Sequence, residues 1–138
     1  MSTRCQIGFY KSATQPLNKP EALIYRHPDG YPGKPDGEKD TADWGVLSDL
    51  VPFCREFQVH RGMDDIPYLA CRTLERLMLE HGTRDQYLSY GISNPNDGLH
   101  GDEAYYYAVS PGLVRVWKTG WDQDLAKLGK PLKSIVIA

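Results

Sequence analysis

The chain has 138 residues, of which 41% are hydrophobic and 25% are charged. This length and composition predict one soluble folded domain, residues 1–138, and argue against two separate domains of ordinary size. The formal net charge of −2 argues against a broad basic face for long nucleic acids, and no apolar run approaches the ~20 residues of a membrane span.

Three cysteines lie at wide spacing within apolar patterns: Cys5, Cys54 and Cys71. An odd number at such spacing favours buried free thiols and therefore a reducing compartment. The N-terminal residues MSTRCQIGFY lack the charged-then-apolar pattern of a secretory signal. We therefore expect a cytoplasmic protein.

The first third of the chain predicts two paired strands and a long loop. Apolar residues alternate at Cys5, Ile7 and Phe9, which predicts a strand with one buried face. Residues 22–27 predict a second strand, antiparallel to the first. Prolines and glycines then crowd residues 28–40, so this segment is expected to be a partly stiffened loop.

Two helices are expected next. Between residues 44 and 57 apolar side chains recur at three- and four-residue steps, with Thr41 or Asp43 as the cap. Pro52 lies inside this pattern and is expected to kink or divide the helix. A second apolar stripe predicts a helix over 65–81, which Gly82 ends.

The remainder of the chain predicts strands over 87–92, 104–109, 113–118 and 134–137. Pro111-Gly112 is typical of a type II turn and predicts a hairpin. The element order predicts an α+β fold, an antiparallel β-sheet with two helices packed on one face. Tyrosines would then form an aromatic surface on the other face, which favours self-association or ligand binding.

The segment RHPDGYPG, residues 26–33, carries the strongest functional pattern. It places Arg26, His27, Asp29 and Tyr31 on a bend that proline and glycine restrain. Arginine offers two parallel hydrogen bonds to a phosphate, and tyrosine offers a stacking face for a base. A stiff loop also loses little entropy on binding. The same residues equally fit a rigid turn in which Asp29 caps backbone N–H groups.

Other polar residues give weaker signals. Tyr105, Tyr107 and Arg115 lie on predicted strands and are further candidate ligand-binding residues, for which simple packing is the alternative. Arg72 and Arg76 predict a solvated helix face paired with Glu75 or Glu80. The loop 94–103 lacks the alternation of a calcium loop, and the histidines lack short metal-ligand spacing, so no metal and no cofactor is expected.

The motif and the element order together resemble a group of small phage and prophage proteins with an H-x-D-G-Y-P turn after the second strand. The resemblance covers about residues 4–118, and its specific motif is Tyr25 to Pro32. The viral anti-Thoeris sponges fit this pattern. They imply a small α+β homo-oligomer in the cytoplasm of the bacterial host that sequesters cyclic ADP-ribose-type signals, and in some members cyclic oligonucleotides, without cleaving them.

Two alternatives stay open at this point. The first is a nuclease or nucleotide hydrolase that uses His27 as general acid or base, with Asp29 or Asp102 nearby. The second is a structural or accessory phage protein in which the turn only maintains the fold. The residues favour a non-catalytic binder, since no G-x-S-x-G pattern or phosphate-binding glycine motif is present.

Overall fold

A computed structural model describes residues 3–81, 90–120 and 123–138. Its elements follow the chain in the order β1 Cys5–Phe9, β2 Ala22–Arg26, α1 Val46–His60, α2 Ile66–His81, β3 Tyr90–Ser93, β4 Tyr105–Ser110, β5 Leu113–Lys118, a short 3₁₀ helix Leu125–Lys127, and β6 Lys133–Val136. Within the described ranges no helix is long and apolar enough to cross a membrane.

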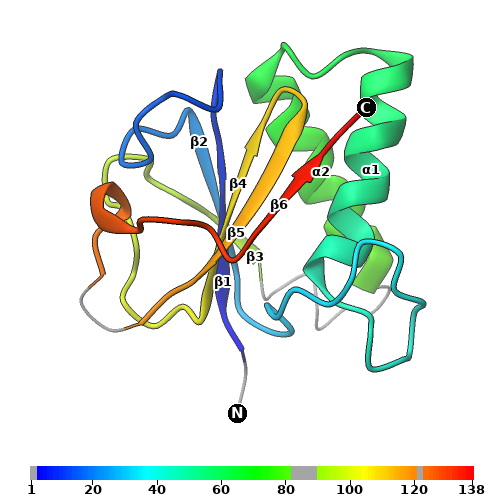
Figure 1. Cartoon of the computed structure of the whole chain (residues 1–138), viewed down its shortest axis with the longest axis horizontal. Helices are drawn as coiled ribbons and strands as arrows, with labels where there is room; N and C mark the ends of the chain where they lie inside the picture. The colour runs from blue at the N-terminus through cyan, green and yellow to red at the C-terminus, as the bar shows by residue number, and fades with distance from the viewer. Residues whose placement is uncertain (1–2, 82–89, 121–122) are drawn as a thin grey trace.

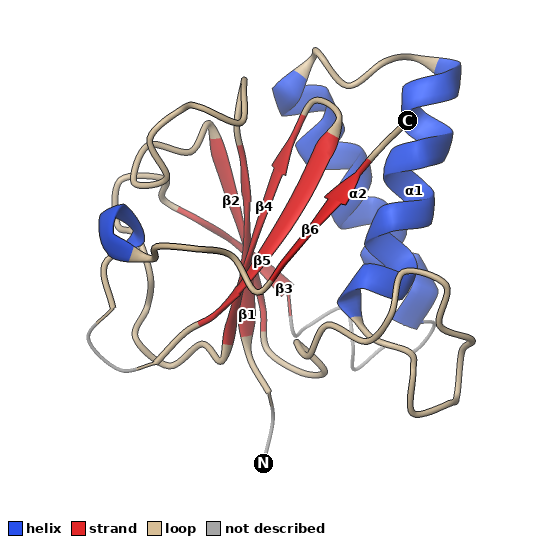
Figure 2. Ribbon diagram, in the orientation of Figure 1, coloured by secondary structure: helices blue, strands red, loops and turns tan. Residues whose placement is uncertain are grey.

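The strands form one six-stranded sheet in the order β3-β2-β1-β4-β5-β6. The predicted antiparallel pairing of β1 with β2 is confirmed, and every other neighbouring pair is antiparallel except β1 with β4. The predicted α+β fold is therefore confirmed, with one parallel pair at the centre of the sheet. Figures 1 and 2 show both helices on the same side of it.

The opposite side of the sheet is covered as well. Loops and the 3₁₀ helix lie there in Figure 1, over a second apolar cluster that includes Tyr10, Tyr106 and Trp117. Leu17, Leu99 and Leu128 from these connecting segments pack against it. All five residues of β1 are consequently buried, so the expectation of one buried face was incomplete. The predicted aromatic surface is wrong, because the connecting segments fold across that face.

Helix α1 is continuous although Pro52 lies inside it, so the predicted division at this residue is wrong. Pro52 is on the exposed side of the helix, where water can hydrate the carbonyl group that proline leaves unbonded. The helix begins at Val46, later than the expected caps. Ser48 Oγ accepts the backbone N–H of Gly45 at 3.0 Å, which satisfies one donor at this end.

The later elements agree well with their predicted ranges. Helix α2 and the β4–β5 hairpin lie where the sequence placed them, and Gly112 has the positive φ of 79° that the turn requires. Part of the predicted strand 87–92 lies in β3. Residues 87–89 and Gly82 lie outside the described residues.

Two tyrosines meet above β1 on the loop-covered side. The hydroxyl groups of Tyr10 and Tyr106 are 2.5 Å apart, and Tyr10 also donates to the carbonyl of Leu17 at 2.6 Å. A Cβ atom on Gly8 would lie 1.8 Å from the Tyr106 hydroxyl oxygen. Glycine is therefore required at this position by the close approach of a buried side chain.

We predict that Gly8→Ala lowers the free energy of unfolding by about 1–3 kcal/mol or more, because the added methyl group displaces Tyr106. Gly91→Ala is the matched control, since a Cβ at this strand position meets no atom within 4 Å. Its effect should stay within about 0.5 kcal/mol. Urea denaturation measures both. Equal midpoints for the two variants would contradict the packing described above.

We also predict that stability falls as the pH rises from about 9 to 12. Burial raises the pKa of the Cys5 thiol from 9.0 to about 12 and that of the Tyr10 hydroxyl from 10.0 to about 12. The unfolded chain therefore releases these protons at lower pH than the folded chain, which favours unfolding. Denaturation midpoints across this range measure the slope, and Cys5→Ala should reduce it. A constant midpoint would contradict the burial of both groups.

Candidate functional site

Arg26 is directed into the protein interior. It is the last residue of β2 and its side chain is fully buried. Its Nε donates to the carbonyl oxygen of Pro28 at 3.0 Å, and its guanidinium carbon lies 5.8 Å from the ring centroid of Tyr90. Arg26 therefore stabilises the turn that follows it, and its position does not support the predicted contact with a ligand.

The backbone of the same turn joins three elements. Gly30 N donates to the carbonyl of Thr3 at 2.7 Å, and the Gly30 carbonyl accepts the Tyr107 hydroxyl at 2.7 Å. The carbonyls of Tyr31 and Pro32 then accept the first N–H groups of α1, at 3.0 and 2.9 Å. The turn thus caps the N-terminus of α1 and links it to β4 and to Thr3, the segment just before β1.

The other two polar residues of the turn remain partly accessible. His27 and Asp29 are half-buried, and Asp29 has a positive φ of 54°. His27 Nδ1 accepts from Arg4 Nε at 3.1 Å, and Arg4 Nε also lies 3.4 Å from Asp102 Oδ2. The Arg4 guanidinium therefore lies between the His27 imidazole and the Asp102 carboxylate, one of the two carboxylates that the hydrolase alternative would combine with His27. No motif in the sequence singled out Arg4.

The three strand residues predicted to bind a ligand lie apart. Tyr107 is fully buried against the helices, and Tyr105 packs beside the same cluster. Arg115 pairs with Ala108 and so faces the loop-covered side, where its guanidinium lies 5.3 Å from the Trp117 ring. Tyr107 and Arg115 therefore lie on opposite faces of the sheet, and the seven predicted residues do not share one site.

A cluster of one imidazole and two carboxylates lies in the loop 94–103. Ligand atoms of His100, Asp102 and Glu103 come within 4.8 Å of one another. Both oxygens of Glu103 accept backbone N–H groups, from His100 and Gly101, and Asp102 pairs with Arg4. These contacts close the loop, and the adjacent guanidinium disfavours a cation. The group is therefore assigned a structural role.

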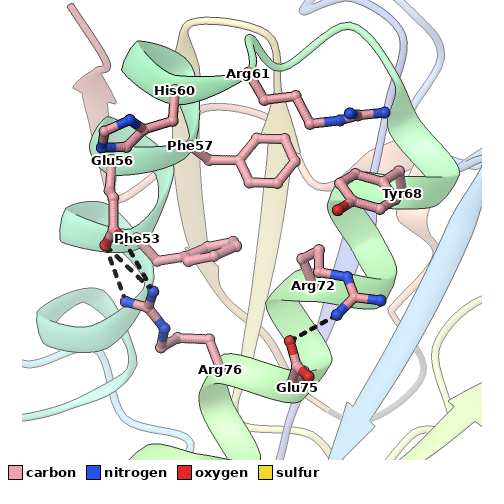
Figure 3. A pocket seen from close by; sticks show the side chains of 9 residues that line it. All are labelled: Phe53, Glu56, Phe57, His60, Arg61, Tyr68, Arg72, Glu75 and Arg76. Carbon is pink, nitrogen blue, oxygen red and sulfur yellow. Dashed lines mark hydrogen bonds and ion pairs between the residues drawn. The ribbon is translucent and has the colours of Figure 1, made fainter.

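Arginines and aromatic rings lie together at another place in the structure. Helices α1 and α2 border a cavity of about 310 Å³, which we call the α1–α2 pocket (Figure 3). Its lining residues come from both helices and from the turn between them: Phe53, Glu56, Phe57, His60, Arg61, Tyr68, Arg72, Glu75 and Arg76. The cavity is open to solvent.

Three rings form the inner wall of the α1–α2 pocket. The ring centroids of Phe53 and Phe57 are 5.5 Å apart, and those of Phe57 and Tyr68 are 5.8 Å apart. Guanidinium groups lie over the ends of this row. Arg76 is 5.0 Å from the Phe53 ring, and Arg61 is 4.0 Å from the Tyr68 ring. Tyr68 is 37% exposed, and the Arg72 guanidinium also lies over its ring, at 5.2 Å from the centroid.

The arginines of the pocket are paired with carboxylates. Arg76 contacts both oxygens of Glu56 at 3.2–3.4 Å, and Arg72 donates to Glu75 at 3.0 Å (Figure 3). Hydrogen bonding by Arg76 lowers the pKa of Glu56, and the charge of Glu75 raises the pKa of Arg72. Both pKa shifts favour the charged forms of Glu56 and Arg72. The predicted Arg72–Glu75 pair is confirmed, whereas Arg76 pairs across to α1.

Comparisons with protein-family models, with curated proteins and with solved structures gave no match. The function must therefore be inferred from the chemistry of the chain itself.

We predict that Arg26→Ala lowers the free energy of unfolding by about 2–4 kcal/mol, because it removes a buried side chain and leaves the Pro28 carbonyl without its donor. Arg55→Ala, at an exposed position of α1, is the control with the same charge change and should stay within about 0.5 kcal/mol. Denaturant titration compares them. An Arg26→Ala protein as stable as the wild type would show that the turn does not depend on this side chain.

Proposed function

We propose that this protein captures a phosphorylated aromatic small molecule of the cyclic ADP-ribose type in the α1–α2 pocket and holds it without cleaving it. The observation that carries the proposal is the presence of three guanidinium groups and three aromatic rings around one cavity. Arginine provides paired hydrogen bonds to phosphate oxygens, and aromatic rings stack with a purine base.

The size and burial of the pocket support a small ligand. A volume of about 310 Å³ lies at the lower end of the range for ligand pockets, ~300–1,000 Å³, so part of a dinucleotide would protrude. The phenylalanine rings are held in the core between the helices, with only 6% and 8% exposed. The binding surface is therefore largely preformed, which reduces the entropy lost on binding.

The residues of the segment 26–33 predicted a binding site at this turn. The proposal keeps the ligand class that this resemblance implies and moves the capture site to the helices. It also keeps the expected setting, a viral or prophage homo-oligomer that acts in the cytoplasm of a bacterial host against a signalling molecule of immunity.

Capture without cleavage is supported by the charges in the pocket. A general base works best when its pKa lies near the operating pH, which for a carboxylate requires an upward shift. The pKa of Glu56 is shifted downward by Arg76, so this carboxylate is a weaker proton acceptor than usual. The cationic groups of the pocket instead favour an anionic ligand in its ground state.

We predict that cyclic ADP-ribose or one of its isomers raises the melting temperature of the wild-type protein. A ligand at a hundred times its dissociation constant adds about 2.7 kcal/mol to stability. Arg76→Ala should weaken binding roughly tenfold or more, since a charged hydrogen bond is lost. Arg55→Ala, outside the pocket, should bind as the wild type does. Calorimetric titration measures the dissociation constant of each variant.

The fate of the bound ligand separates this proposal from its alternatives. After heat denaturation of the complex, full recovery of intact ligand supports capture, and a linear product supports a hydrolase. If no nucleotide shifts the melting temperature, the protein has a structural or accessory role. Loss of binding in His27→Ala with retention in Arg76→Ala would place the site at the turn instead.

A further inference from the structure

We infer that β3 is a dimerisation edge, which pairs with β3 of a second copy of this chain and buries Ile92 against the same residue of that copy. The inference concerns a different surface from the α1–α2 pocket and does not depend on the proposed function.

The outer edge of β3 lacks the usual protection against pairing. β3 is the last strand at one end of the sheet, so one of its edges has no neighbouring strand among the described residues. Proteins usually protect such an edge with a charged residue or a proline. β3 has the sequence Tyr-Gly-Ile-Ser and contains neither. In contrast β6, at the other end of the sheet, contains Lys133 and follows Pro131 closely.

The side chain of Ile92 is exposed on the helix-covered face of the sheet. Ile92 pairs with Ile24, which belongs to the core under the helices, so both side chains lie on this face. Ile24 is only 3% exposed, whereas Ile92 is 79% exposed. The cover that α2 provides by packing on β2 therefore ends before β3. A strand added to this edge would bring apolar side chains against Ile92.

An apolar groove lies beside Ile92, between α2 and the edge of the sheet. Its volume is about 220 Å³, and its described lining residues are Ala22, Leu23, Ile24, Pro67, Ala70, Cys71, Leu74 and Ile92. No charged side chain is among them, so two copies of this surface meet without like-charge repulsion. The volume is below the range of ~300–1,000 Å³ for small-molecule pockets and suits aliphatic side chains instead.

A second copy supplies the side chains that fill this groove. A twofold axis perpendicular to the sheet at Ile92 pairs the two β3 strands antiparallel and keeps the helices of both copies on one face. The two β2 strands, with α2 over each, are then three strand spacings apart, about 14 Å, compared with ~8–10 Å for helices in direct contact. The two Ile92 side chains lie in the space that remains. One surface thus carries both the protruding residue and the groove, as a symmetrical dimer requires.

This dimer leaves the α1–α2 pocket open. On α2 the groove residues Pro67, Cys71 and Leu74 follow one another at steps of four and three, which is one helix face. The pocket residues Tyr68 and Arg72 each come one position later, which is ~100° further around the helix. The groove and the pocket therefore lie on different sides of α2.

Light scattering of the full chain over a range of concentrations measures the dimer. Ile92→Lys should raise the dissociation constant of the dimer roughly tenfold or more, because two ammonium groups replace an apolar contact at the axis. Its far-UV circular dichroism should stay unchanged, since the side chain is exposed. Val136→Lys is the matched control, at a 68% exposed position of the other edge strand, and should dimerise as the wild type does.

Cys71 provides a second measurement of the same interface. Its thiol is exposed and lines the groove, whereas Cys5 and Cys54 are buried. A short bismaleimide should therefore join two copies through Cys71 in the wild type and in Val136→Lys. At the same protein concentration the cross-linked dimer should be much reduced in Ile92→Lys and absent in Cys71→Ser.

Three results would overturn the inference. The first is a wild-type protein that stays monomeric up to about 1 mM, the weak end of protein association. The second is a dimer that Ile92→Lys leaves unchanged or that Val136→Lys disrupts equally, since the contact then lies elsewhere. The third is a dimer that forms no cross-link at Cys71. None of these measurements involves a ligand, so their outcome is distinct from that of nucleotide binding.

Discussion

The structure depends on the backbone of one turn, at Gly30 to Pro32. The Gly30 N–H donates to the carbonyl of Thr3, just before β1, and the Gly30 carbonyl accepts the Tyr107 hydroxyl of β4. The carbonyls of Tyr31 and Pro32 accept the first N–H groups of α1. A side chain at Gly30 would meet the backbone of residues 3 and 4 within 2.8 Å. The sheet and α1 are therefore fixed to each other at one point, which sets the direction of α1 and the pocket that it shares with α2.

Tyrosines act mainly inside this fold. The hydroxyl groups of Tyr10, Tyr106 and Tyr107 all have hydrogen-bond partners in the interior, and burial raises the pKa of each. Buried tyrosine adds apolar area while its hydroxyl group finds a partner, so it suits a sheet that is covered on both faces. The tyrosine content thus reflects the second, loop-covered core and not an exposed platform.

The sequence contained enough information for the elements with strong local patterns. Helix α2 has an uninterrupted apolar stripe, and Pro111-Gly112 specifies a turn through backbone geometry alone, so both could be predicted. The second face of the sheet is covered by loops. Their polar composition predicts segments exposed to solvent, so their packing over a core could not be predicted. The direction of the Arg26 side chain could not be predicted either, because arginine is rarely fully buried and a long-range contact with Tyr90 fixes it.

The α1–α2 pocket illustrates the same limit at the functional level. Phe53 and Phe57, and separately Arg72 and Arg76, each follow the four-residue spacing of one helix face, which is typical of packing or of a solvated surface. Only the pairing of the two helices brings them to one cavity, and the Arg76–Glu56 contact between helices has no counterpart in local sequence.

The location of the bound ligand tests the central claim most directly. Crystals of the protein soaked with cyclic ADP-ribose should show the phosphates at the arginines of the α1–α2 pocket, with Tyr68 beside the base. Electron density for the ligand at residues 26–33, with an empty space between the helices, would contradict it.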